Sequence, residues 1–510
     1  MNLSFVPSFA MARQRVTAQD LYNYTKCLHR VYLDSNGDAS EKSEVSSFVK
    51  LLWEVGLQTE QDYISSLGDQ EIVDLQNLAV EPAFQKTILA MEHGAAVIYQ
   101  GCLIHEQFVG RPDLLVKRED GASRFGKYLY EPIDIKAGKG WEEGEGKKRK
   151  FKEHYAFQIL FYRLLLERIQ GTVPAGGRII NVDKQLEEFD PAPFEERFYQ
   201  AMQDVQHLVS GEETSEPVLG SHCTMCGWFS RCYRWVKAES DPTGLFFVGK
   251  QKFALREQGL RTIEDIAGMD VQTYLKPPHK IPRMGKISLA RMKERAQVLL
   301  EGKPRIRSGY TLPEVEREIY FDIEDDPTRG VTYLFGMVIR DEKDPSRFTY
   351  FLAKTPEDEE QTVRDFWQFI QSTDGAVYYV YSHKERSTLK RLMEKYDLDA
   401  DTFEKYKASE FDLYQDLIVE YSDWPTFSYG IKHIAKFIGF QWRDVDPSGA
   451  NSIAWYNDYL ANPANEALLN RILEYNEDDC YAMAAITRYF EHHAHKNQVT
   501  TEGQAHKGEC

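Results

Sequence analysis

Ile319-Tyr320-Phe321-Asp322-Ile323-Glu324 is the stretch that decides the fold of the C-terminal part of this chain. Successive side chains of a β-strand point to opposite faces, so Asp322 and Glu324 share one face and the apolar side chains share the other. The apolar face predicts a strand that packs on a core. The acidic face offers two hard oxygen ligands of the kind that Mg²⁺ and Mn²⁺ prefer. Paired ions at such carboxylates activate water in phosphodiester cleavage, which makes a nuclease the first hypothesis.

Composition sets broad limits on the class of protein. A length of 510 residues predicts two or three domains, and 42% hydrophobic with 28% charged residues is typical of soluble globular protein. We find no signal sequence and no membrane-spanning run, and therefore expect a cytoplasmic protein without a membrane partner. A net charge of −18 is unusual for a nucleic-acid-binding protein. It does not exclude that function, because binding depends on the local field and acidic metal sites contribute to the charge.

The chain divides into four segments by pattern. Residues 1–240 alternate helix and strand signals, residues 241–310 read as short helices separated by Gly and Pro, and residues 311–494 suit an α/β domain. The polar residues 495–510 are expected to be disordered. Lys303–Gly309 reads as a linker. The predicted fold class is therefore α/β and multidomain, with a small helical segment between two α/β domains.

Two acids and a lysine are expected to converge in the N-terminal segment. The predicted strands there are 95–99, 113–116 and 128–136, followed by a covering helix over 151–169. Asp113 follows Gly-Arg-Pro, and the alternation at the end of the third strand places Asp134 and Lys136 on one face. Such a trio can hold a metal through its carboxylates while the lysine orients water or stabilises negative charge.

Further polar residues follow the same pattern on helices. Gln158 and Tyr162 lie four residues apart on the covering helix and so share a face, and Glu60 offers another metal ligand from an earlier helix. In order, these six residues resemble the RecB-type PD-(D/E)XK nucleases, whose fold is restriction-endonuclease-like. The resemblance covers roughly residues 15 to 240. It implies catalytic roles for Asp113, Asp134, Lys136, Gln158 and Tyr162. Many relatives have a histidine where this chain has Glu60.

The cysteines indicate a soft metal centre. Cys223, Cys226 and Cys232 are close together and lack one thiolate for a four-cysteine site, which Cys27 can supply. One distant N-terminal cysteine with a C-terminal Cys-x-x-Cys-x5-Cys resembles the iron-sulfur motif of RecB-family and CRISPR-associated nucleases, which implies a structural 4Fe-4S cluster. Zinc held by the same four thiolates is the alternative.

Two basic or helical regions are candidates for contact with phosphate. The segment from Lys136 to Lys152 includes Lys147-Lys148-Arg149-Lys150, and it can be a phosphate-contacting loop or a solvated loop without a partner. The middle segment resembles helix-hairpin-helix modules, in which a turn presents backbone N–H groups to a phosphate. A connecting helical spacer is the alternative.

The C-terminal segment offers more carboxylates for the site begun by Asp322 and Glu324. Tyr475 and Asp479 are one turn apart on a predicted helix, so that the hydroxyl can orient water while the aspartate binds metal. Asp-x-Glu on a strand with Tyr-x-x-x-Asp on the last helix resembles the DEDD exonucleases of the ribonuclease-H-like superfamily. Glu385 stands where that superfamily has a middle aspartate. Lys432 could contact phosphate.

The whole arrangement resembles a prokaryotic family of RecB-like nucleases with a YprB-type ribonuclease-H-like domain. The resemblance implies a nuclease with two metal-dependent sites that acts on nucleic acid, with DNA that is single-stranded or has free ends as the expected substrate. No Gly-x-x-x-x-Gly-Lys-Ser/Thr motif is present, so unwinding would need a separate helicase. A binding or processing factor with one active site, or none, is the second hypothesis. The sequence indicates no oligomeric state.

Overall fold

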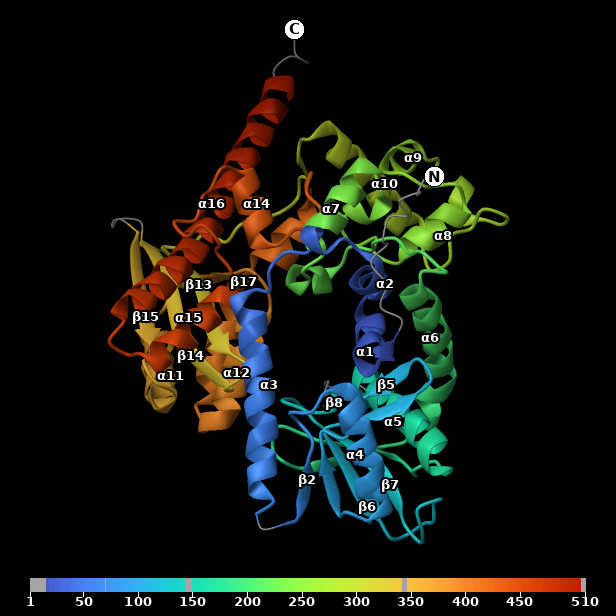
Figure 1. The fold of residues 1–510 in the computed structure, drawn as a ribbon. Coiled ribbons are helices and arrows are strands. Elements are labelled where there is room, and N and C mark those ends of the chain that lie inside the picture. The colour runs from blue at the N-terminus through green and yellow to red at the C-terminus, as the bar shows by residue number, and fades with distance from the viewer. Residues whose placement is uncertain (1–14, 69, 143–148, 342–345, 506–510) are drawn as a thin grey trace, which may run out of the picture. The chain divides into compact units, whose positions relative to one another are not determined.

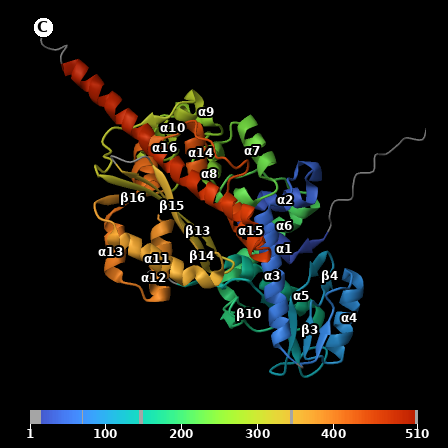
Figure 2. The same ribbon diagram turned by 90° about the vertical axis from the view of Figure 1, so that its left-hand side faces the viewer.

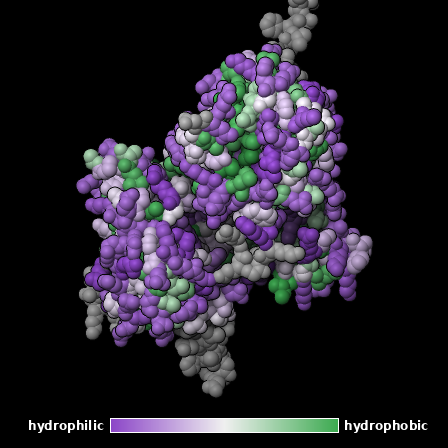
Figure 3. All heavy atoms as spheres, turned by 90° about the horizontal axis from the view of Figure 1, so that it is seen from below, coloured by the Kyte–Doolittle hydropathy of each residue, from purple (hydrophilic) through white to green (hydrophobic). Residues whose placement is uncertain are grey.

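The computed structural model describes residues 15–68, 70–142, 149–341 and 346–505. The chain forms two compact units, Met1–Arg234 and Trp235–Cys510. Within the described residues, no helix combines the length and the apolar character needed to cross a bilayer. Hydrophilic side chains cover most of the face seen in Figure 3. The sequence-based limits at residues 240, 310 and 494 remain predictions, and the middle helical segment belongs to the second unit.

A mixed six-stranded sheet is the centre of the first unit, with the order β11-β10-β7-β6-β3-β2. The strands are β2 (Ile72–Asp74), β3 (Val97–Tyr99), β6 (Leu114–Arg118), β7 (Leu129–Ile135), β10 (Gly177–Ile180) and β11 (Leu186–Phe189). Strand β7 is buried along its whole length, pairing antiparallel with β6 and parallel with β10. The three strands predicted from residues 95 to 136 are confirmed as β3, β6 and β7. A second, three-stranded sheet has the order β1-β5-β4, from Val16–Thr17, Phe108–Gly110 and Leu103–His105.

Helix α5 (Glu153–Gln170) packs on the sheet and confirms the predicted covering helix (Figures 1 and 2). Its buried residues extend around the helix, because α1 (Ala18–Lys26) and α6 (Ala192–Ser210) pack on its other faces. Helix α1 begins with a capping box of Thr17 and Asp20. The remaining longer helices of this unit are α2 (Leu28–Asn36), α3 (Ser47–Ser66), α4 (Val80–Glu92) and α7 (Phe229–Ala238), which continues into the second unit.

The second unit contains a five-stranded sheet with the order β15-β14-β13-β16-β17. The strands are β13 (Arg317–Asp326), β14 (Val331–Asp341), β15 (Arg347–Leu352), β16 (Ala376–Val380) and β17 (Glu410–Asp412). Strands β13, β14 and β15 pair antiparallel, whereas β16 and β17 add in parallel. The prediction of an α/β domain in this part of the chain is confirmed.

Helices cover both faces of this sheet. On the side of Phe321 lie α11 (Glu359–Ser372), α12 (Lys384–Tyr396) and α13 (Ala400–Ala408). On the side of Tyr320 lie α14 (Ile431–Phe437), α15 (Gly449–Ala461) and α16 (Glu466–Ala505). Helix α16 continues to Ala505 where the sequence predicts disorder from residue 495. Extending an existing helix adds residues at little cost when no proline interrupts it. Residues 506–510 lie outside the described residues.

Within the predicted linker Lys303–Gly309, only Arg305 and Ile306 form a strand, and the other residues are irregular. Strand β12 (Arg305–Ile306) pairs antiparallel with β18 (Ser422–Asp423). The fully buried carboxylate of Asp423 receives ion pairs from Arg291 and Arg295 of α10 (Lys286–Glu301), and a third from Arg307. A buried charge requires such partners, and this network ties the helical segment to the domain that follows it. The short helices α8 (Gln251–Glu257) and α9 (Ile263–Gly268) pack with α10 in a small core of their own.

Candidate active sites

Three carboxylates come together at the end of β13 and on α16. One oxygen each of Asp322, Glu324 and Asp479 lies within 4.8 Å of the others. Strand alternation places the first two on one face, as predicted, and the helix contributes the third. Glu324 and Asp479 are buried, with 4% and 5% of their surfaces exposed. A donor set of three closely spaced carboxylates fits a hard divalent cation, so this acidic triad can hold a metal ion.

The acidic triad is electrostatically unfavourable without a cation. Burial and the nearby Asp479 carboxylate raise the pKa of Asp322 to about 7. Burial, followed by the charge of Asp322, holds the pKa of Glu324 well above its ordinary value. Both shifts express the cost of keeping like charges close together away from water. A divalent ion would remove that cost.

Two lysines flank the acidic triad. Lys432 Nζ donates to Tyr475 Oη over 2.9 Å and lies 3.4 Å from Asp479 Oδ2. Lys384 Nζ lies 2.7 Å from Asp325 Oδ1, and the acidic residues around it raise its pKa although burial acts to lower it. Trp442 also donates its indole N–H to Asp479 Oδ1 over 2.7 Å. The predicted residues Tyr475 and Lys432 therefore lie at the site, whereas the sequence assigned no role to Lys384 or Trp442.

Glu385 lies near Asp322 without joining the acidic triad. It is 4% exposed, and its Oε2 atom has no hydrogen-bond partner among the described residues. Burial and the charge of Asp322 raise its pKa to about 8. The residue begins α12, so its carboxylate approaches from a different element than the other three. An unpartnered buried oxygen beside Asp322 is compatible with the predicted ligand role, which remains a prediction.

Asn476, which was not predicted as a site residue, holds Asp322 in place. Its Nδ2 donates to Asp322 Oδ2 over 2.8 Å and to the backbone carbonyl of Asp322 over 3.3 Å. Gly336, opposite Asp322 in β14, makes room for this amide. A Cβ atom at residue 336 would lie 1.6 Å from Asn476 Oδ1. A glycine inside a buried strand was the only available signal for this close approach.

Gly336→Ala is expected to lower the free energy of unfolding by about 2 kcal/mol, because the added methyl group must displace the fully buried Asn476. Urea unfolding of the purified chain measures this change. Gly268→Ala in the same unit is the matched control, since a Cβ at residue 268 meets no atom within 4 Å. Equal stability of both variants would contradict the close approach of Gly336 and Asn476.

The raised pKa values of Asp322 and Glu324 predict a pH-dependent effect of metal on stability. A carboxyl group whose pKa is raised by folding contributes stability below its unfolded pKa, and that contribution is lost as pH rises through the folded value. For Asp322 this loss spans about pH 4 to about pH 7. A bound cation reverses it, so Mg²⁺ should raise the melting temperature more at about pH 8 than at about pH 6. Thermal unfolding with and without Mg²⁺ tests this, and Asp322→Asn should reduce the difference.

The N-terminal acids and lysine also come together, at the ends of β6 and β7. Lys136 Nζ donates to Asp134 Oδ2 over 2.7 Å and to Gln158 Oε1 over 3.0 Å. Asp113 Oδ2 accepts the backbone N–H of Ile135 over 2.7 Å, and the backbone N–H of Asp113 lies 3.4 Å from Asp134 Oδ1. Burial and the charge of Asp134 raise the pKa of Asp113 well above its ordinary value. Burial acts to lower the pKa of Lys136, and the two carboxylates outweigh it and raise that pKa.

Glu60 reaches this site through a residue that sequence reasoning missed. Gln100 Nε2 donates to Glu60 Oε1 and, over 3.0 Å, to Asp113 Oδ1. Gln100 lies in the turn after β3, where its backbone has a φ of 53°. Tyr99 also bonds Glu60, and burial together with that bond raises the pKa of Tyr99.

Tyr162 lies beneath the N-terminal site with its side chain buried. Its hydroxyl approaches Arg111 O at 3.5 Å, and burial raises its pKa well above the ordinary value. On the other side of Lys136, the ring of Tyr155 lies 5.3 Å from Nζ. The six residues predicted for this site thus gather around one pair of carboxylates, and their catalytic roles remain predictions. The basic segment predicted to contact phosphate falls largely on residues 143–148, which lie outside the described residues.

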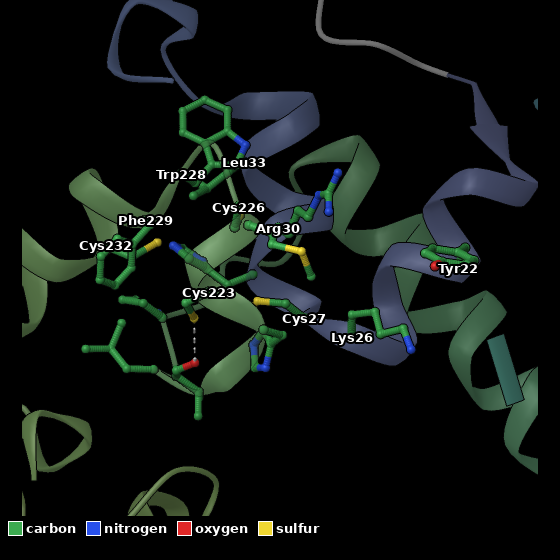
Figure 4. Close-up of a pocket in the computed structure, with 16 residues that line it drawn as sticks. Tyr22, Lys26, Cys27, Arg30, Leu33, Cys223, Cys226, Trp228, Phe229 and Cys232 are labelled. Atoms are coloured by element: carbon green, nitrogen blue, oxygen red, sulfur yellow. Dashed lines mark hydrogen bonds between the residues drawn. The ribbon is translucent and has the colours of Figure 1, made fainter. Parts of the chain in front are cut away.

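The four predicted cluster cysteines line one cavity of about 320 Å³. Cys27 lies between α1 and α2, Cys223 and Cys226 lie in the turn at residues 221–226, and Cys232 lies on α7 (Figure 4). Burial raises the pKa of the Cys223 thiol to about 11 and that of Cys232 to about 12. Four thiols around one space have the donor chemistry of a soft metal centre.

Two family models match the chain, each over a different domain. Residues 24–233 match the model of the PD-(D/E)XK nuclease superfamily, and residues 319–491 match that of the RNase_H superfamily. The chain is therefore a mixed α/β protein with a PD-(D/E)XK domain followed by an RNase H-like domain. No curated protein was found to match it.

Proposed function

We propose that this protein is a metal-dependent nuclease with two active sites, which hydrolyses the phosphodiester bonds of single-stranded or free-ended DNA. The observation that carries the proposal is the acidic triad of Asp322, Glu324 and Asp479, whose oxygens lie within 4.8 Å of one another beside two lysines. This arrangement supports a site that binds a cation and a phosphate together. Both domains belong to nuclease superfamilies, which supports nucleic acid as the substrate.

At the C-terminal site, each residue has a defined task in the proposed reaction. A divalent ion, when bound by the acidic triad, supplies Lewis-acid stabilisation and lowers the pKa of water. Lys384 and Lys432 attract the phosphate. Tyr475 holds the attacking water through its hydroxyl, which Lys432 Nζ keeps in place at 2.9 Å. Asn476 fixes the position of the Asp322 carboxylate. Glu385, which is buried near Asp322 but outside the acidic triad, would add a fourth carboxylate.

At the N-terminal site, Asp113, Asp134 and Glu60 would hold the cation. Lys136 stabilises the negative charge that develops on the phosphate in the transition state. Gln158 keeps the lysine in place from α5, since its Oε1 accepts a hydrogen bond from Lys136 Nζ. The buried side chain of Tyr162 packs next to these carboxylates. The ion pair between Lys136 and Asp134 holds the lysine beside the carboxylates before substrate arrives.

The four cysteines are proposed to hold a 4Fe-4S cluster that ties the N-terminal helices to residues 223–232. A single zinc ion with Zn–S bonds of about 2.3 Å requires sulfur atoms about 3.8 Å apart. Among the described residues, no three cysteine sulfurs lie within 4.8 Å of one another. This wider spacing favours a multi-iron cluster over zinc. Metal analysis of anaerobically purified protein distinguishes the two.

A second candidate function is nucleic-acid binding or processing with only one active site. The position of Glu385 outside the acidic triad favours this candidate, because the family resemblance implies an aspartate among the ligands. In that case the RNase H-like domain would bind the strand and the PD-(D/E)XK domain would cut it. A cytoplasmic location and a separate helicase partner stay predictions.

The proposed function is tested by incubating end-labelled single-stranded DNA with the full chain in Mg²⁺ or Mn²⁺. The wild-type protein should shorten the strand, and chelation of the divalent ion should stop it. The double variant Asp134→Ala/Asp322→Ala should leave the strand intact. An intact strand with the wild-type protein under all these conditions would overturn the proposal, and cleavage by the double variant would place the activity elsewhere.

A further inference from the structure

Helix α3 is unusual because none of its 20 residues is buried. Its C-terminal turns contact the sheet through the half-buried Tyr63 and Ile64. Its N-terminal half and the residue that follows it carry exposed apolar side chains instead, with Leu52 38%, Trp53 58% and Leu57 52% exposed. Figure 1 shows this half standing apart from α1 and α2. Large exposed apolar side chains on one element indicate a surface that binds something.

One face of α3 leads directly into the N-terminal candidate site. Trp53, Gly56 and Glu60 follow the spacing i, i+3, i+7 and therefore share a face of the helix. Glu60 is joined to Asp113 through the Gln100 side chain. Trp53 lies two turns before Glu60, about 10 Å along the helix axis. A strand that reaches the proposed cleavage site along this face of α3 would therefore pass the indole of Trp53.

The helix surface at Gly56, between Trp53 and Glu60, has room for a ligand. Among the described residues, a Cβ atom built on Gly56 meets nothing within 4 Å. The lack of a side chain leaves the backbone accessible between an aromatic ring and an acidic metal ligand. Lys50, an exposed residue one turn before Trp53, adds a positive charge at the outer end of this face.

We infer that the Trp53–Gly56–Glu60 face of α3 seats the single strand that enters the N-terminal site, with Trp53 stacking on a base. The inference rests on the proposed function for this site. An exposed indole suits a substrate without fixed sequence, because every base has a π-face on which it can stack. A distance of about 10 Å from Glu60 corresponds to roughly two or three nucleotides of stacked strand. Gly56 lets the sugar-phosphate backbone lie against the helix.

The test uses the full chain with oligothymidylate of about 20 nucleotides that carries 5-iododeoxyuridine, in Ca²⁺. Ultraviolet crosslinking followed by mass spectrometry should place the crosslink on the peptide that contains Trp53. Fluorescence anisotropy of a labelled oligothymidylate should show that Trp53→Ala raises Kd about tenfold, while Trp53→Phe largely restores binding. Tyr199→Ala, which removes an aromatic side chain 53% exposed on α6, is the matched control and should leave Kd unchanged.

Gly56→Leu separates strand binding from folding. The added side chain enters open space on a helix, so the melting temperature should stay the same or rise. Gly56→Leu should nevertheless raise the Kd for oligothymidylate about tenfold, because the leucine side chain fills the space proposed for the strand. Crosslinks confined to residues outside 47–66, with an unchanged Kd for Trp53→Ala, would overturn the inference. So would a change in oligomeric state caused by Trp53→Ala, which would indicate a protein contact on this face.

The outcomes also separate this inference from the proposed function. If the oligonucleotide crosslinks to Trp53 but the chain cleaves no DNA, the proposed strand-binding face is supported and the proposed nuclease activity is refuted. If Trp53→Ala and Gly56→Leu cleave DNA as fast as the wild-type protein, the nuclease activity is supported and the proposed strand-binding face is refuted. Because the crosslink reports its own position, binding elsewhere on the chain does not obscure the result.

Discussion

Asp322→Asn should lower cleavage at the C-terminal site by about a thousandfold. The substitution preserves the shape of the side chain while removing one anionic oxygen from the acidic triad, so the cation loses a ligand and the phosphate loses its counter-charge. The measurement is the rate of DNA cleavage in a chain whose N-terminal site is inactivated by Asp134→Ala.

Asp341→Asn is the matched control for Asp322→Asn, because it changes a partly exposed aspartate at the end of β14 that pairs with Arg317 over 2.6 Å. That variant should retain the rate of the parent chain. Retention of the parent rate by Asp322→Asn would show that the acidic triad does not catalyse cleavage.

Lys136→Met should lower cleavage at the N-terminal site by roughly a hundredfold, because methionine keeps the length of the side chain without its charge. It also leaves the 1% exposed Asp134 carboxylate without its ion-pair partner, which should cost about 3 kcal/mol of unfolding free energy in the absence of metal. The rate is measured in the Asp322→Asn background, and stability by urea unfolding with and without Mg²⁺.

Lys117→Met on the neighbouring strand β6 is the control for Lys136→Met, since Lys117 pairs with the exposed Glu119 at 3.6 Å. Lys117→Met should change neither the cleavage rate nor the free energy of unfolding appreciably. If Lys136→Met cleaves as fast as its parent, the lysine has only a structural role and the proposed stabilisation of phosphate charge is wrong.

Local periodicity predicts the residues whose chemistry and position coincide along the chain. Asp322 and Glu324 follow from strand alternation, Tyr475 and Asp479 from helical spacing, and each pair lies where the pattern predicts. The three strands β3, β6 and β7 and the covering helix α5 follow from the same signals, whereas β2, β10, β11 and the three-stranded sheet were not predicted.

Residues whose hydrogen bonds join different helices and strands could not be predicted from local periodicity. Asn476 is a neutral amide within an acidic helical stretch, and its hydrogen bond to Asp322 joins positions far apart in sequence. Gln100 lies in a turn whose positive φ could not be read from an ordinary glutamine. The exposed face of α3 was also missed, because an apolar periodic pattern predicts burial and does not reveal a helix that lacks a partner.

Diffraction from crystals soaked in Mn²⁺, recorded for its anomalous signal, tests most directly whether these carboxylates hold divalent ions. We expect one peak among Asp322, Glu324 and Asp479, and another beside Asp113 and Asp134. Peaks at other positions, or none at these two clusters in Mn²⁺-saturated crystals, would contradict the two proposed metal sites.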